Sequence, residues 1–258
     1  DCCPLQDDGA WLVEKFLDCD GFLMAAPVWC LSPNAIVTVF RDRVIGPKLD
    51  PQSFKMFGRV PEWVKGRVKE RPGALISVGG ACTENWTSLS LPTLYTAAFT
   101  PQTNVVDHMN VTAVADMGAA VLRDDLMERA AKLGENLADA VLHMEEEHPA
   151  KWRGDTTPTA CPNCHQNLLI MHPGTNQCEC AVCGKFGTVS MVDNKLSFTF
   201  EETDVNDRLT PAGKLTHGQE IFRVKREIYE PNKDKIPAKW QPYKDYESCV
   251  VTAPSRRK

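Results

Sequence analysis

The sequence predicts an α/β protein built on a parallel sheet, followed by a small β domain that holds a metal ion. Three observations lead to this prediction. Over residues 7–145, short apolar runs alternate with amphipathic segments, which is typical of a parallel sheet covered by helices on both faces. The helical periodicity then stops in the stretch 149–158. Beyond it, five of the 11 cysteines lie between Cys161 and Cys183.

The first elements follow one another closely. Apolar residues spaced three or four apart, after an acidic start, predict a helix over 7–20. The apolar run 22–26, closed by Pro27, is typical of a strand buried on both faces. In Ser32-Pro33 a capping hydroxyl precedes a proline suited to the first helical position, so a second helix is expected to begin there.

A longer excursion separates these elements from the next strand. Residues 46–72 combine Pro, Gly and basic residues with aromatic side chains, and predict an ordered segment rather than a linker. The strongest strand of the sequence covers 74–80 and ends in the pair Gly79-Gly80, where backbone can approach a ligand closely. A further helix is expected to start near Leu89.

The remaining elements define the expected domains. A third strand is predicted over 105–111, and an apolar helical face predicts a long helix over 122–144. We therefore expect an α/β domain of residues 1–148, a small β domain of residues 149–200, and a charged C-terminal extension of residues 201–258.

Composition and charge exclude several classes of protein. The chain has the 43% hydrophobic and 24% charged residues of a globular protein. Its 34 Asp and Glu residues outnumber the 29 Lys and Arg, so it lacks the basic excess of nucleic-acid binders. No apolar run reaches the roughly 18 residues that a membrane span needs. We expect no nucleic-acid partner and no membrane span. The odd cysteine count suits a reducing compartment, which predicts a cytoplasmic protein.

Two cysteine pairs have the spacing of a metal site. Cys161 and Cys164 form one C-x2-C pair, and Cys180 and Cys183 form another after fifteen intervening residues. Two turns at this spacing present four thiolates tetrahedrally to one ion. Zinc is the first choice; a rubredoxin-like iron and metal-free thiols are the alternatives. We interpret Cys178 as a spare thiol, since closed structural zinc sites take four ligands.

The stretch around these cysteines resembles a zinc ribbon over about 40 residues. The β-hairpin of such a ribbon is expected after the second pair, at 188–191 and 196–200. His165 competes with the cysteines as a ligand. The other histidines considered show neither metal nor catalytic-triad spacing, and we interpret them as surface or capping residues: His108, His143, His148, His172 and His217.

Two loops carry residues suited to a flat, apolar ligand. Pro27 closes the first strand at the end where doubly wound sheets bind their ligands, and Val28 and Trp29 follow with flat apolar surface. Gly79-Gly80 closes the second strand and lets a second backbone segment approach the same ligand.

The two loops resemble those of the NAD(P)H-dependent FMN reductases and iron–sulfur flavoproteins of the flavodoxin-like superfamily. The family's first loop reads S-P-V-Y, then Ser, then M-K-x-F-x-D-R, which residues 25–43 match in part, with Phe40 and Asp42-Arg43. The resemblance covers residues 3–145 and implies a flavodoxin-like doubly wound parallel sheet. The FMN-binding residues that it implies lie in the two loops: Pro27, Val28, Trp29, Ser32, Asn34, Gly79, Gly80 and Glu84.

The sequence also departs from this family. Val37-Thr38 stands where the family has Met-Lys. Flavodoxin-like folds begin with a strand and a loop that binds the FMN phosphate, and no such segment precedes Asp1. Only three of the expected five parallel strands are predicted. Either the first strands are missing from this sequence, or the chain is a degenerate relative that no longer binds flavin as the family does.

A second cofactor is considered at the N-terminus. Cys3 lies four residues before Asp7-Asp8, as in the C-x3-D-D that closes the cluster-binding run of the iron–sulfur members. Cys2 and Cys3 are then either plain thiols or the end of a [4Fe-4S] ligand run whose other cysteines lie upstream.

The resemblance implies an FMN-dependent oxidoreductase that transfers electrons from NAD(P)H through bound flavin to an unidentified acceptor. In such enzymes the flavin carries the chemistry, so no catalytic side chain is expected. The alternative is a non-catalytic assembly or electron-transfer subunit built on a flavodoxin-like remnant and a metal ribbon. The family's flavin pockets are completed by a neighbouring subunit, which implies a homo-oligomer, a dimer or tetramer; the aromatic residues Phe54, Phe57 and Trp63 are suited to its interface.

Overall fold

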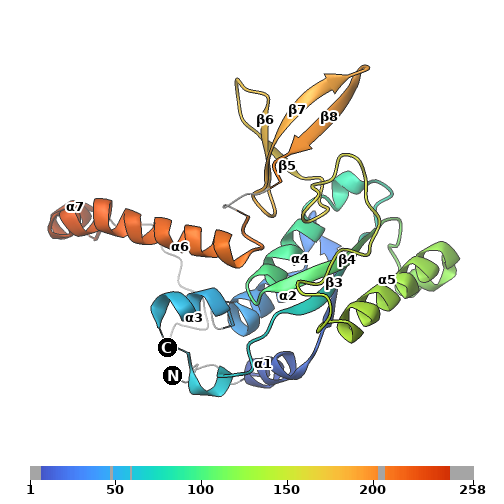
Figure 1. The fold of residues 1–258 in the computed structure, drawn as a ribbon, viewed down its shortest axis with the longest axis horizontal. Helices are drawn as coiled ribbons and strands as arrows, with labels where there is room; N and C mark the ends of the chain where they lie inside the picture. Colours follow the sequence, from blue (N-terminus) through green and yellow to red (C-terminus); the bar gives the residue numbers. More distant parts are fainter. Residues whose placement is uncertain (1–6, 47–48, 59, 203–206, 245–258) are drawn as a thin grey trace. The chain divides into compact units, whose positions relative to one another are not determined.

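The computed structural model describes residues 7–46, 49–58, 60–202 and 207–244, and its ribbon is shown in Figure 1. The chain divides into two compact units, Asp1–His217 and Gly218–Lys258. The first unit contains both the parallel sheet and the cysteine-rich β structure. The domain limits predicted from composition, after residues 148 and 200, stay predictions.

A mixed four-stranded sheet of order β2-β1-β3-β4 organises the first part of the chain. Its three long strands, β1 (Phe22–Trp29), β3 (Arg71–Val78) and β4 (Thr103–Val111), run parallel, as the sequence predicts. Side chains alternate across the sheet, so Leu75 packs in the cluster that contains α4 residues while the adjacent Ala74 packs against α5. Helices therefore cover both faces, and the fold is the predicted flavodoxin-like α/β type.

The start of the second helix differs from its prediction. Ser32 and Pro33 form the two-residue strand β2 (Ser32–Pro33), antiparallel to the end of β1, and α2 (Ala35–Phe40) begins after Asn34. The reason is a tight turn in which Cys30 and Leu31 both have positive φ, 51° and 71°. A turn of this type folds the chain back onto β1 and draws Ser32 into the sheet.

One helix precedes the first strand of this part, and the others follow the strands in sequence. They are α1 (Gly9–Asp18), α2 with its π-helical continuation η1 (Arg41–Ile45), α3 (Pro51–Phe57), α4 (Ser90–Phe99) and α5 (Asp124–Leu142). Short 3-10 turns are η2 (Glu62–Val64), η3 (Glu84–Trp86) and η4 (Ala119–Leu122). The helices predicted over 7–20, near Leu89 and over 122–144 are thus confirmed, with shorter bounds.

The cysteine-rich segment, residues 161–200, forms an antiparallel sheet and is called the ribbon from here on (Figure 1). Its strands in spatial order are β5 (Leu169–Met171), β6 (Gln177–Cys180), β7 (Phe186–Val192) and β8 (Lys195–Phe200). The predicted hairpin is confirmed as β7 and β8. Asp193 and Asn194 form its two-residue turn with positive φ, which short polar side chains tolerate well.

Helical structure follows the ribbon. Its elements are α6 (Pro211–Val224), the π-helical turn η5 (Lys225–Tyr229), the 3-10 segment η6 (Glu230–Lys235) and α7 (Ile236–Lys244). None of the helices in the described part of the chain combines the length and the apolar character needed to cross a bilayer.

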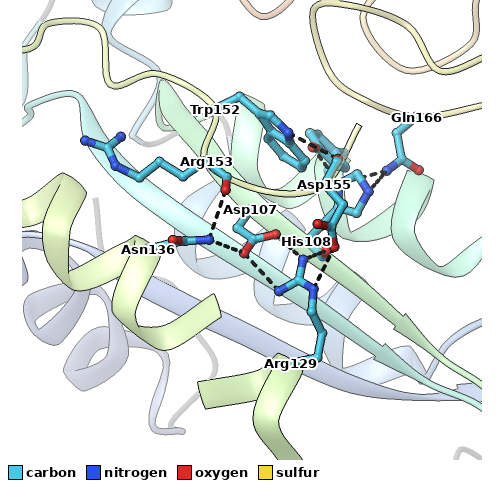
Figure 2. A network of polar contacts seen from close by, with 9 residues as sticks. Asp107, His108, Arg129, Asn136, Trp152, Arg153, Asp155 and Gln166 are labelled. Carbon is cyan, nitrogen blue, oxygen red and sulfur yellow. Dashed lines mark hydrogen bonds and ion pairs between the residues drawn. The ribbon is translucent and has the colours of Figure 1, made fainter. Parts of the chain in front are cut away.

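A buried ion pair connects the sheet, α5 and the segment that leads to the ribbon (Figure 2). Asp107 lies in β4 with its side chain fully buried, and Arg129 of α5 donates to both of its oxygens at 2.6 and 3.0 Å. Asn136 of α5 donates to Asp107 at 2.9 Å and to the carbonyl of Arg153 at 3.1 Å. The carboxylate therefore accepts three hydrogen bonds, and both helix residues are fixed by it.

The segment 152–155, called the strap, covers the free edge of β4. The backbone amides of Arg153 and Gly154 both donate to the carbonyl of Val106, at 2.7 and 3.2 Å. A Cβ atom at Gly154 would overlap the carboxylate of Asp107, so only glycine allows this approach. The strap thereby occupies the unpaired edge of the sheet and carries the chain from α5 to the ribbon.

We expect Arg129→Leu to lower the free energy of unfolding by about 3–5 kcal/mol, because it leaves the Asp107 carboxylate buried without its cation. Urea denaturation measures the loss. The matched control is Arg123→Leu, since Arg123 makes a similar two-bond pair with Asp125 at the surface. This control should leave the urea midpoint unchanged, and equal losses in the two variants would contradict the prediction.

Candidate functional site

The structure brings the two predicted flavin loops together at one edge of the sheet. Because β1 and β3 are parallel, with Pro27 opposite Val78, their carboxyl ends meet. A Cβ atom at Gly79 would overlap Thr87 and lie 3.7 Å from Val28, so the glycine lets the second loop close on the first. We call the loops 27–34 and 79–84 the carboxyl edge.

The remaining predicted loop residues are arranged around the β1–β2 turn. Trp29 lies opposite Ser32 in the hairpin and is 70% exposed, which leaves a flat apolar surface at the carboxyl edge. The amide of Asn34 donates to the carbonyl of Pro27 at 3.2 Å and ties the start of α2 to the strand. Gly80 approaches Ala115, on the loop after β4, and Glu84 is exposed in η3.

The four predicted metal ligands are brought together in the ribbon. The sulfurs of Cys161, Cys164, Cys180 and Cys183 all lie within 4.8 Å of one another, and all four residues are buried. Four thiolates around zinc, at about 2.3 Å each, require separations of this order. Cys178 is buried but outside this group, and within the described chain His165 is not part of it either.

Two matching turns present these sulfurs. In the first, the amide of His165 donates to the carbonyl of Cys161 at 2.8 Å; in the second, that of Gly184 donates to Cys180 at 2.9 Å. Both donors have positive φ, 57° and 83°. The second turn uses glycine, as expected, whereas the first places a histidine in this unfavourable conformation. We call residues 161–166 and 180–185 the first and second knuckles.

The sulfurs of this cluster lie within hydrogen-bond reach of one another: Cys161 and Cys183 are 3.4 Å apart, as are Cys164 and Cys180. Hydrogen bonding with Cys161 lowers the pKa of Cys180 and raises that of Cys183. Four close, buried sulfurs suit a cation that replaces the thiol protons on binding. The donor set fits a thiophilic metal such as zinc or iron.

We expect Cys164→Ser to release a bound metal and unfold the ribbon, because three thiolates leave the closed tetrahedral site incomplete. Metal analysis by mass spectrometry gives the metal content, and circular dichroism the loss of structure. Cys178→Ser is the control, since it removes a buried thiol of the same ribbon from outside the cluster. Full metal occupancy in Cys164→Ser would contradict the assignment.

The first knuckle is bound to the α/β part through Tyr95 of α4. Its hydroxyl is buried and donates to the carbonyl of Cys164 at 2.7 Å. Burial raises the pKa of Tyr95 well above its usual range, so the group stays a donor. The four cysteines belong to the same apolar cluster as Leu75 and Leu94, so the ribbon shares its core with the sheet.

His108 extends this contact into a chain of hydrogen bonds (Figure 2). Its Nδ1 lies 3.1 Å from the Tyr95 oxygen, whose proton goes to Cys164. The Gln166 amide nitrogen lies 3.2 Å from Nδ1 and 3.4 Å from Nε2. With the donated proton on Nδ1, Nε2 is the ring nitrogen that can accept from this amide. Burial lowers the pKa of His108 to about 4, in keeping with this neutral form. The interpretation of His108 as a surface or capping histidine is therefore wrong.

The folded-state pKa of His108 lies below the ordinary value of 6.5, so the unfolded chain takes up its proton first as the pH falls. The stability from the neutral ring is present above pH 6.5 and decreases down to about pH 4. We expect a loss of about 3 kcal/mol from this group, measured by urea denaturation across that range. Burial also lowers the pKa of His165 to about 4, so this residue adds a similar pH dependence. His108→Gln should therefore reduce the slope without abolishing it, and the exposed His143→Gln should retain it. An unchanged slope in His108→Gln would refute the assignment.

A cavity of about 740 Å³ lies beside this chain. Its walls come from η3 and the start of α4, the end of β4, the first turns of α5, and residues 165–168 of the ribbon. Among the predicted flavin residues, Glu84 lines it. The sequence did not predict that residues of the ribbon and of α5 would line the same cavity. Their contacts join positions as far apart as His108 and Gln166, which no local pattern reveals.

Comparison with known proteins finds a sequence relative and similar solved structures. No protein-family model matches it. Over 201 residues it is 28% identical to flavone synthase cfoJ of Aspergillus candidus, matching 74% of this chain and 59% of that protein. The chain thus spans 59% of the length of this curated relative.

A solved structure titled flavone reductase is similar with a TM-score of 0.78 and 25% identity, covering 98% of this chain and 86% of that one. The likeness therefore includes the ribbon as well as the sheet. The Trp repressor binding protein from Bacillus subtilis gives a TM-score of 0.38 at 18% identity, over 51% of this chain and 73% of that one. This similarity is too low to support a conclusion about fold or function.

Proposed function

We propose that this protein is an FMN-dependent oxidoreductase that passes electrons from NAD(P)H through bound flavin to an organic acceptor. The observation that carries the proposal is the likeness to flavone reductase over nearly the whole chain. The sequence relative is also named for a redox reaction of a flavone. The acceptor class that these names suggest is an aromatic ketone of the flavone type.

The carboxyl edge is the proposed flavin site. Its surface fits a flat apolar ring, because exposed Trp29 offers flat apolar surface and Gly79 lets the second loop close against Val28. The residues that would contact FMN are those of the two loops: Pro27, Val28, Trp29, Ser32, Asn34, Gly79, Gly80 and Glu84.

When bound, FMN would supply the hydride-transfer chemistry. The loop residues bind and orient the ring, and we assign no catalytic acid or base among them. The backbone bond from Asn34 to Pro27 and the packing of Gly79 on Thr87 hold the two loops in register. These contacts fix the surface on which the ring would rest.

The four ribbon cysteines are proposed to hold structural zinc, with iron as the alternative metal. Zinc has no redox chemistry, and a closed four-thiolate site leaves no position for a substrate, so the metal serves the fold. The prediction of an iron–sulfur cluster at Cys2 and Cys3 concerns residues outside the described part of the chain.

A homo-oligomer, a dimer or tetramer, stays part of the proposal. Phe57 and Trp63 are exposed by 61% and 44%, as a contact surface requires. Phe54, in contrast, packs against the apolar cluster around α1. It is only partly buried, and its expected role in the interface stays a prediction.

We expect Trp29→Ala to weaken FMN binding by about 1–3 kcal/mol, the scale of a buried aromatic contact. Titration of the full-length apoprotein, followed by flavin fluorescence, measures the change. The control is Trp11→Ala, since Trp11 of α1 is also largely exposed but lies outside the carboxyl edge. If the wild-type protein leaves flavin fluorescence unchanged, the alternative of a non-catalytic assembly or electron-transfer subunit replaces the proposal.

A further inference from the structure

The cavity beside His108 shares a wall with the carboxyl edge. Thr87 and Glu84 line it, and Thr87 is the residue on which Gly79 packs. On the opposite side, His165 and Gln166 of the first knuckle line it directly after the ligand Cys164. Its volume, about 740 Å³, lies within the roughly 300–1,000 Å³ of small-molecule sites. The cavity is thus placed between the proposed flavin site and the metal site.

The charges of the cavity are unsuited to an anion. Among the lining residues that the structure describes, Arg129 is the single lysine or arginine, whereas Glu84, Asp125 and Asp155 are acidic. Two of these carboxylates are paired, Asp125 with Arg123 and Asp155 with Arg129. The Arg129 guanidinium already donates to Asp107, Asp155 and a backbone carbonyl. An incoming phosphate or carboxylate would therefore meet carboxylates without an available cation. This argues against the pyrophosphate of a nicotinamide dinucleotide as the occupant.

The walls suit a flat aromatic compound. The His165 ring stacks on Trp152 at a centroid distance of 3.9 Å and an interplanar angle of 14°, so Trp152 supports a planar group in the wall. The apolar side chains that line the cavity are Leu91, Pro92, Met109, Leu126 and Leu168. An aromatic ring system buries favourably against such a surface.

We propose that this cavity binds the electron acceptor of the proposed reaction, an uncharged, planar aromatic compound that carries a carbonyl group. That the bound compound is the electron acceptor rests on the proposed function. The cavity, its charges and its aromatic wall do not depend on that function. The first knuckle is then a wall of the binding site, so the metal also shapes the site that receives the acceptor.

Calorimetric titration of the purified full-length protein with flavone, and with a flavone that carries a sulfonate group, tests the charge argument. Flavone should bind at least tenfold more tightly than the sulfonate, because the cavity would bury the anion without an available cation. Equal affinities, or tighter binding of the sulfonate, would overturn the proposal.

Two variants test the location from opposite walls. Asn167→Trp in the ribbon and Ser88→Trp before α4 should each fill the cavity and weaken flavone binding at least tenfold. Asn176→Trp is the control, an exposed asparagine of the ribbon that does not line the cavity. Flavone binding that survives both filling variants would place the site elsewhere.

FMN titration of the same proteins separates the two proposals. If FMN binds and flavone does not, the cavity assignment fails while the flavin function stands. If flavone binds with the expected variant pattern and FMN does not, the cavity stands as a binding site and the oxidoreductase proposal fails.

Discussion

The carboxylate of Asp107, fully buried in the middle of β4, constrains much of the first unit. An unpaired charge at this depth is strongly destabilising, so the chain must supply partners for it. Arg129 and Asn136 do so from α5, and their remaining donors reach the strap through Asp155 and the carbonyl of Arg153. One buried charge thus fixes the rotation of α5, the course of the strap and the covering of the open edge of β4.

The strap delivers the chain to the ribbon, and a second set of contacts completes the connection. Tyr95 binds the carbonyl of Cys164, and His108 links Tyr95 to Gln166. Neither contact is available to an isolated ribbon, since Tyr95 and His108 belong to α4 and β4. The cavity exists because these two attachments hold residues 165–168 opposite the start of α4. The cysteine cluster, the packing of the sheet and the shape of the cavity are therefore parts of one arrangement.

The sequence predicted correctly those features that depend on residues close together along the chain. The three parallel strands and the Cys161–Cys183 cluster follow from apolar runs and from cysteine spacing, which depend on neighbouring residues. The β2 strand was missed because Cys30 and Leu31 adopt positive φ without a glycine or asparagine to indicate a turn. The role of His108 was missed because its partners Tyr95 and Gln166 lie 13 and 58 residues away. Long-range partners of this kind leave no periodic signal in the sequence.

The ion pair of Asp107 and Arg129 is better understood as a source of specificity than of net stability. Desolvation of two charges offsets most of their attraction, and apolar replacements of a whole buried pair are often neutral or stabilising. Such a replacement would nevertheless remove the guanidinium that holds Asp155 and the carbonyl of His108. It would also remove the carboxylate that positions Asn136, the donor to the carbonyl of Arg153. A chain with an apolar pair could fold its sheet and still place the ribbon less uniquely. We infer that the buried charges of Asp107 and Arg129 fix the position of the cavity wall.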